Sequence, residues 1–229
     1  MKQHHSPFFF TAFFFVALVA TSLTPGHAQT AAPGATPRPL PITAENPGRL
    51  SEPLAARIAK AIADGTCTPT ESTREPGGGT ETPKEGAVLV GFEYLLDQTG
   101  GKADVRSLRP LYLTAKGTVK GADRGLLPKV SGRVVARPGY AVAGLVTWQA
   151  DFGRIGGIQV IFGRLDQNAG KLDLTPQNSY ESKWFGTKPR NEPTKKLGGD
   201  GSLPVGVFGR TGSDADTIGL ILMPAALAK

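Results

Sequence analysis

The residues best suited to chemistry form a short stretch near the C-terminus that holds two carboxylates. Apolar runs at 205–209 and 217–223 flank it. Because Gly and Asp favour tight turns, the pattern predicts a β-hairpin with this stretch as its loop. Such a loop gathers backbone N–H donors and carboxylate acceptors at one rim, which suits the adjacent hydroxyls of a sugar. The candidate residues are Gly212, Ser213, Asp214, Ala215 and Asp216.

Residues 1–28 are predicted to be a secretory signal peptide. Lys2 supplies the positive charge, an apolar run follows at 7–23, and Gly26-His27-Ala28 is a small-x-small cleavage site. The apolar core is shorter than a membrane-spanning helix requires. We therefore expect a secreted protein (extracellular, periplasmic or at the cell surface) with no integral membrane segment in the mature chain.

Removal of the signal peptide excludes several classes of site. The chain's three histidines, His4, His5 and His27, all lie within it, and Cys67 is the one cysteine. A mature chain without histidine cannot carry a Ser-His-Asp or Cys-His mechanism or a His-ligated metal. A single cysteine allows no intrachain disulfide and no thiolate cluster. We expect no metal, no cofactor and no catalytic residues.

The net charge gives a weak indication of partners. It is +7 for the whole chain and +6 once Lys2 is removed, which favours acidic polymers or surfaces. The basic residues are scattered, apart from a loose cluster between Lys188 and Lys196. A solvated loop explains this cluster better than nucleic-acid binding does.

The chain divides into four regions: the signal peptide at 1–28, a linker at 29–48, a short helix and loop at 49–76, and a β domain at 77–229. The linker is rich in Ala, Pro and Thr and is expected to be disordered. Leu54, Ile58 and Ile62 recur every four residues and predict a helix over 51–64.

Beyond residue 86 the apolar residues alternate instead, as in strands. Gly, Pro, Asn and Asp clusters separate the short runs. This pattern predicts an all-β fold of antiparallel strands. The expected strands are 87–96, 105–113, 133–136, 140–147, 155–165, 205–209 and 217–223.

The last hairpin resembles that of the jacalin-related lectins. Residues 206–219 read G-V-F-G-R-T-G-S-D-A-D-T-I-G, which is similar to the family's C-terminal pattern with its G-x-x-x-D sugar loop. The stretches 138–144 and 155–165 resemble two further strands of the family. The resemblance covers roughly 77–223 and implies a β-prism of three antiparallel sheets, whose first strand pairs with the C-terminal hairpin.

The resemblance also implies a site between the hairpin loop and a glycine-rich loop before the first strand. It implies that Gly212 opens the loop, that Ser213, Asp214 and Ala215 contribute backbone groups, and that Asp216 contributes its carboxylate. Gly78 or Gly79 would face them. The chain departs from the family in three places. The glycine run is only Gly77-Gly78-Gly79, with no Trp before it, and Glu75 and Glu81 flank it. Ala215 stands where a larger apolar or aromatic residue is common.

Three functions remain open at this point. The first is a secreted, non-catalytic, lectin-like protein that binds a carbohydrate or glycoconjugate and could form an oligomer. The second is a structural or envelope-associated module that has lost the sugar site and acts through protein–protein contacts. The third, a glycosidase using Asp214 and Asp216, is disfavoured because two carboxylates on one loop are poorly placed to flank a scissile bond.

Overall fold

The computed structural model describes residues 48–73, 78–98, 102–150, 153–210, 212 and 214–225. The expected signal peptide and the expected linker as far as residue 47 lie outside the described residues. So do Gly77 of the glycine run and Ser213 of the expected site.

The first element is the helix α1 (Glu52–Ala63), which confirms the helix predicted over 51–64. Pro53 fits the first turn because the N–H groups of that turn have no partner within the helix. Leu54, Ile58 and Ala61 are buried along one face. The helix ends before Gly65, whose φ of +68° suits glycine.

The first of three antiparallel sheets joins the beginning of the folded chain to its end. Its strands, in spatial order, are β1 (Thr68–Pro69), β14 (Gly219–Met223), β13 (Leu203–Gly209) and β2 (Gly79–Glu81). Pairing of β1 and β2 with the C-terminal hairpin agrees with the expected topology. Since β1 precedes residue 77, the sheet extends into the region expected to hold only helix and loop.

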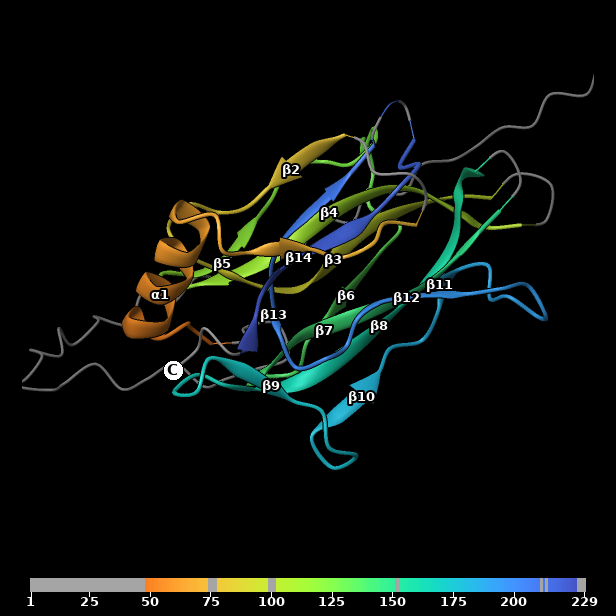
Figure 1. The fold of residues 1–229 in the computed structure, drawn as a ribbon. Helices are drawn as coiled ribbons and strands as arrows, with labels where there is room; N and C mark the ends of the chain where they lie inside the picture. The colour runs from red at the N-terminus through yellow and green to blue at the C-terminus, as the bar shows by residue number, and fades with distance from the viewer. Residues whose placement is uncertain are drawn as a thin grey trace, which may run out of the picture. The chain divides into compact units, whose positions relative to one another are not determined.

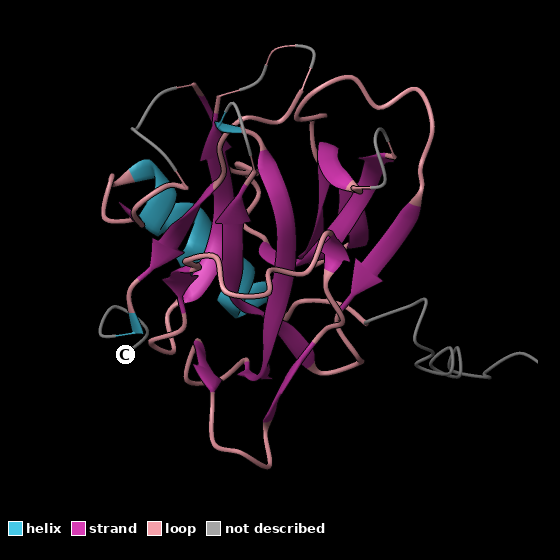
Figure 2. Cartoon of the chain, turned by 90° about the vertical axis from the view of Figure 1, so that its right-hand side faces the viewer, coloured by secondary structure: helices cyan, strands magenta, loops and turns pink. Residues whose placement is uncertain are grey.

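The second and third sheets are also antiparallel (Figures 1 and 2). The second has the order β5 (Gly117–Lys120), β4 (Asp104–Thr114), β3 (Val88–Asp97), β6 (Gly132–Val135). The third has the order β10 (Ser179–Glu181), β8 (Ile155–Asp166), β7 (Tyr140–Gln149), β12 (Lys195–Gly198), and β9 (Lys171–Asp173) and β11 (Phe185–Gly186) also pair with β8.

The three sheets enclose one hydrophobic core. The central strands β3, β7 and β13, one from each sheet, contact one another. Phe92, Leu145 and Val207 from these strands are all buried in the same cluster. This arrangement confirms the prediction of an all-β chain folded as a β-prism. Ile58 of α1 belongs to the same cluster, so the helix is part of this folded unit.

The described residues include no helix that is long and apolar enough to cross a membrane.

Candidate functional site

The predicted hairpin loop is the connection between β13 and β14. At its base the Arg210 N–H donates to Thr217 Oγ1 at 2.6 Å. The Arg210 carbonyl accepts from the N–H groups of Asp216 at 3.3 Å and Thr217 at 3.5 Å. Nearer the tip the Gly212 N–H donates to the carbonyl of Asp214 at 3.1 Å. The loop is therefore closed by its own backbone, as its Gly and Asp content predicts.

Asp214 ties this loop to the other two sheets. Its Oδ1 lies 3.1 Å from Arg106 Nε on β4, and its Oδ2 lies 3.5 Å from Arg154 Nη2, in the turn between β7 and β8. The side chain of Asp214 is 19% exposed. Its carboxylate therefore fixes the position of the loop.

Ala215 is fixed in a similar way. Its N–H donates to the carbonyl of Arg106 at 2.7 Å. The residue is only 1% exposed, so its methyl group belongs to the core. The backbone donor and the side chain of Ala215 are thus already used within the protein.

Asp216 differs from Asp214 and Ala215. The residue is partly exposed. Among the described residues, its carboxylate has neither a hydrogen-bond nor an ion-pair partner. Within the described part of this loop, Asp216 therefore supplies the carboxylate that is not used in an internal contact.

The glycine run lies against the end of β13. Gly79 pairs with Gly209 in the register of β2 and β13. Gly78 has a φ of +103°, and a Cβ added to it would lie 1.9 Å from the carbonyl oxygen of Gly209. Only glycine fits such an approach. The structure thus brings Gly78 and Gly79 to the base of the hairpin loop.

A third segment, residues 121–126, was missed by the sequence analysis. It belongs to the connection between β5 and β6. Arg124 Nη1 donates to the carbonyl of Gly79 at 2.7 Å, and its Nη2 lies 3.4 Å from Glu81 Oε2. A Cβ added to Gly125 would lie 3.1 Å from the Ala215 backbone nitrogen. This segment therefore lies against both the glycine run and the hairpin loop, through the buried Arg124 on one side and Gly125 on the other.

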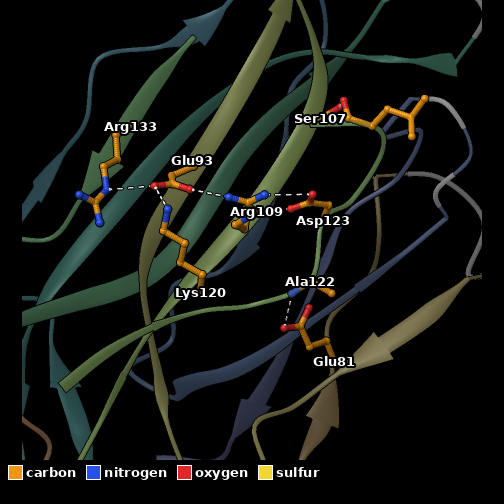
Figure 3. Close-up of polar contacts among 9 residues, drawn as sticks. Glu81, Glu93, Ser107, Arg109, Lys120, Ala122, Asp123 and Arg133 are labelled. Carbon is orange, nitrogen blue, oxygen red and sulfur yellow. Dashed lines mark hydrogen bonds and ion pairs between the residues drawn. The ribbon is translucent and has the colours of Figure 1, made fainter. Parts of the chain in front are cut away.

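Glu93 on β3 organises the charges beside this segment (Figure 3). Its side chain is 7% exposed and lies 3.1 Å from Arg109 Nη1, 3.0 Å from Lys120 Nζ and 3.8 Å from Arg133 Nε. Burial raises the pKa of Glu93, but these cations lower it by more, so the pKa is below its ordinary value. Glu93 therefore stays ionised, and the positive charges of these three side chains balance its negative charge.

Arg109 connects this network to the third segment. Its Nε lies 2.5 Å from Asp123 Oδ1 and its Nη2 donates to Asp123 Oδ2 at 3.0 Å. Nearby, the N–H of Ala122 donates to Glu81 Oε1 at 2.9 Å (Figure 3). The network thus holds residues 121–124 against the second sheet and β2, which is a structural role.

Trp148 and the basic cluster have partners outside the hairpin loop. Trp148 is buried, and its Nε1 donates to the carbonyl of Thr187 at 2.5 Å. Trp184 is partly buried. In the basic cluster, Lys195 lies 2.8 Å from Glu71 Oε2. Across the described part of the chain, no group of three or more His, Cys, Asp or Glu side chains could hold a metal ion.

Comparison with known proteins gives matches among solved structures. No family model matches the chain, and no curated protein matches it. The chain resembles jacalin-related lectins. Frutapin, a lectin from Artocarpus incisa, matches with 16% identity and a TM-score of 0.46 over 69% of this chain and 97% of that chain.

Two further structures match over the same share of this chain. A mannose-binding jacalin-related lectin from Ananas comosus has 14% identity and a TM-score of 0.45, with 98% of that chain covered. An agglutinin from Calystegia sepium has 16% identity and a TM-score of 0.47, with 96% of that chain covered.

Proposed function

We propose that this protein is a secreted, non-catalytic, lectin-like protein that binds carbohydrate at the rim made by residues 212–216 and Gly78–Gly79. The observation that carries the proposal is the division of roles within the loop. Asp214 and Ala215 are held by contacts with the other sheets. The carboxylate of Asp216, in contrast, has no hydrogen-bond or ion-pair partner among the described residues, and Asp216 is partly exposed.

This division suits the binding of hydroxyl groups. A carboxylate accepts strong hydrogen bonds from sugar hydroxyls. A loop already fixed by Arg106 and Arg154 loses little conformational entropy when a ligand binds, so more of the interaction energy appears as affinity. Since Asp214 is engaged in ion pairs, Asp216 has no second free carboxylate on this loop with which to flank a glycosidic bond.

A second function is supported by the burial of Ala215. Because the Ala215 side chain is buried, the hairpin loop offers a sugar no apolar contact at this position. A β-prism without a sugar site would act as a structural or envelope-associated module through protein–protein contacts.

The variant Asp216→Asn tests the proposal. It keeps the side chain's shape and removes its charge, so each charged hydrogen bond lost should weaken binding by about 1.5–3 kcal/mol, or roughly ten- to a hundredfold. The matched control is Glu181→Gln, which removes an exposed carboxylate from β10. Retention on a glycan array and the thermal midpoint are measured for both variants and the wild type.

We expect the wild type and Glu181→Gln to retain the same glycans, and Asp216→Asn to lose retention with an unchanged thermal midpoint. Equal retention by Asp216→Asn would move the site elsewhere, with Trp184 and its basic neighbours as the next candidates. A wild type that retains no glycan would contradict carbohydrate binding and favour the structural module.

A further inference from the structure

Two large apolar side chains of the described residues are exposed, Leu126 at 61% and Val130 at 42%. Both belong to the connection between β5 and β6. A single exposed apolar side chain is common on protein surfaces and has no meaning by itself. Its position relative to the candidate site decides whether it matters.

The backbone of residues 124–126 runs beside the hairpin loop. A Cβ added to Gly125, the residue before Leu126, would lie 3.1 Å from the backbone nitrogen of Ala215. The carbonyl of Leu126 accepts a hydrogen bond from the hydroxyl of Ser107 on β4. One residue further back, Arg124 exchanges backbone hydrogen bonds with Leu108. The backbone of Leu126 is thus fixed where the second sheet meets the loop that carries Asp216.

Val130 lies on the same connection but is anchored elsewhere. The next residue, Ser131, donates its N–H to the carbonyl of Tyr94 on β3, and its hydroxyl accepts from the N–H of Leu96. This places Val130 toward β3 and β6.

A saccharide site needs an apolar wall as well as polar groups. Sugars present C–H faces and, in some classes, methyl groups, and small-molecule sites pair a few polar groups with apolar surface. The hairpin loop supplies Asp216 for the hydroxyls, but its Ala215 is buried. The exposed apolar side chain on the segment that lies against this loop is that of Leu126.

The following inference rests on the proposed function. We propose that Leu126 forms the apolar wall of the saccharide site and selects sugars that carry a methyl group, as 6-deoxyhexoses and N-acetylhexosamines do. An aliphatic side chain packs around a methyl group as it would in a protein core. Each methyl group removed from water is worth about a fourfold gain in affinity.

The experiment compares sugars with and without this group. A 6-deoxyhexose has a methyl group where the parent hexose has a hydroxymethyl group, and an N-acetylhexosamine has an acetamido group where the parent has a hydroxyl. Immobilised 6-deoxyhexoses and N-acetylhexosamines are each paired with the parent hexose, in the gluco, galacto and manno series. Retention of the wild type, Leu126→Ser and Val130→Ser is measured, with the thermal midpoint of each protein. Val130→Ser is the matched control because it makes a similar apolar-to-polar change on the same connection.

We expect the wild type and Val130→Ser to prefer the methyl-bearing member of a pair about fourfold, and Leu126→Ser to lose that preference with little change in thermal midpoint. Equal retention of both members by the wild type, or an unchanged preference in Leu126→Ser, would overturn the role of Leu126 alone. A wild type that retains none of the sugars would overturn the proposed function and this inference together.

Discussion

Glu93 is a carboxylate in a largely buried strand, and the cations around it explain why it is tolerated. Arg109, Lys120 and Arg133 lie within 3.8 Å of it and come from the three other strands of the same sheet, β4, β5 and β6. Because their effect on its pKa exceeds that of burial, the folded-state pKa lies below the value in the unfolded chain. The stabilisation is therefore present above the unfolded-state pKa and is lost as the pH falls through the folded-state pKa.

The variant Glu93→Gln should lower the free energy of unfolding by about 1–3 kcal/mol at about pH 7, because the charge that pairs with three cations is gone. The difference from the wild type should shrink as the pH falls below about 4.3, the ordinary pKa of a glutamate, because the unfolded wild-type chain then binds a proton at this residue. It should shrink further as the pH falls through the lower pKa of the folded protein. Urea denaturation over a pH series measures both effects. Glu181→Gln serves as the control and should show neither, and a difference that stays constant down to about pH 3 would contradict the charge-based explanation.

Gly78 carries the contact between the glycine run and the hairpin, and Gly139 provides a matched comparison. Both have positive φ values, +103° and +79°, but a Cβ on Gly139 would meet no atom within 4 Å. Gly139→Ala should therefore cost about 1–2 kcal/mol of backbone strain alone. Gly78→Ala should cost more, because its Cβ would collide with the carbonyl of Gly209.

Hydrogen exchange locates this second effect. In Gly78→Ala, the amides of β2 and the end of β13 should lose protection, whereas in Gly139→Ala they should keep it. Equal costs and equal protection in the two variants would show that the close approach of Gly78 to β13 does not stabilise the rim.

Among the elements, the helix and the long strands could be predicted because their signals are local. The apolar repeat of Leu54, Ile58 and Ile62 gave the helix to within one residue at each end. The short edge strands could not be predicted. β1 consists of Thr68 and Pro69, both exposed, and β5 carries no run of apolar residues. These segments are strands because a neighbouring strand supplies hydrogen bonds. Such pairing cannot be predicted from the residues of the segment itself.

The candidate site also has a part that could be predicted from the sequence and a part that could not. The hairpin loop could be predicted from its own Gly and Asp residues. The ion pairs of Asp214 with Arg106 and Arg154, and the bridge from Arg124 to Gly79, join segments far apart in the sequence. Arg124 lies between two glycines in a polar stretch, which is a weak signal, so its burial became evident only in the fold.

The helix α1 offers a test of whether it is an integral part of the prism. Ile58 is fully buried in the common core, so Ile58→Ala should lower the free energy of unfolding by about 2–5 kcal/mol. The control is Lys60→Ala on the exposed side, where an exposed ion pair with Asp64 is worth at most about 0.5 kcal/mol.

Unfolding is followed both by the helical signal of far-UV circular dichroism and by tryptophan fluorescence. The fluorescence reports on Trp148 in the third sheet and on Trp184, which lies between two strands of that sheet. Both probes should shift together in Ile58→Ala. Loss of the helical signal at a denaturant concentration that leaves the fluorescence unchanged would show that the helix unfolds separately.

At the scale of the whole molecule, the contacts of the N-terminal segment indicate where the folded unit begins. The carbonyl of Arg49 accepts from Gln167 Nε2 at 3.3 Å, and the N–H of Leu50 donates to the carbonyl of Thr114 at 3.0 Å. The side chain of Leu50 is 2% exposed.

A chain that begins at Arg49 should therefore keep the stability of one that begins at Gln29, since the segment between them is Ala/Pro/Thr-rich. A chain that begins at Ser51 should lose about 1.5–3 kcal/mol, because it lacks the buried Leu50 side chain. Thermal and urea denaturation of the three chains measure the difference. A large loss already at Arg49 would contradict the linker prediction.

The pairing of β1 with β14 has a consequence for how the chain reaches its native state. Thr70 Oγ1 accepts from the N–H of Leu220, and 150 residues separate the two. Ordering a contact of such sequence separation is slow, because the loop entropy is lost before the contact forms. The first sheet cannot be completed until the last strand has left the ribosome, at a synthesis rate of about 5–20 residues per second. Until β14 has emerged, the nascent chain thus stays incompletely folded, which suits a protein that must be threaded through a membrane before it folds, as the proposed export requires.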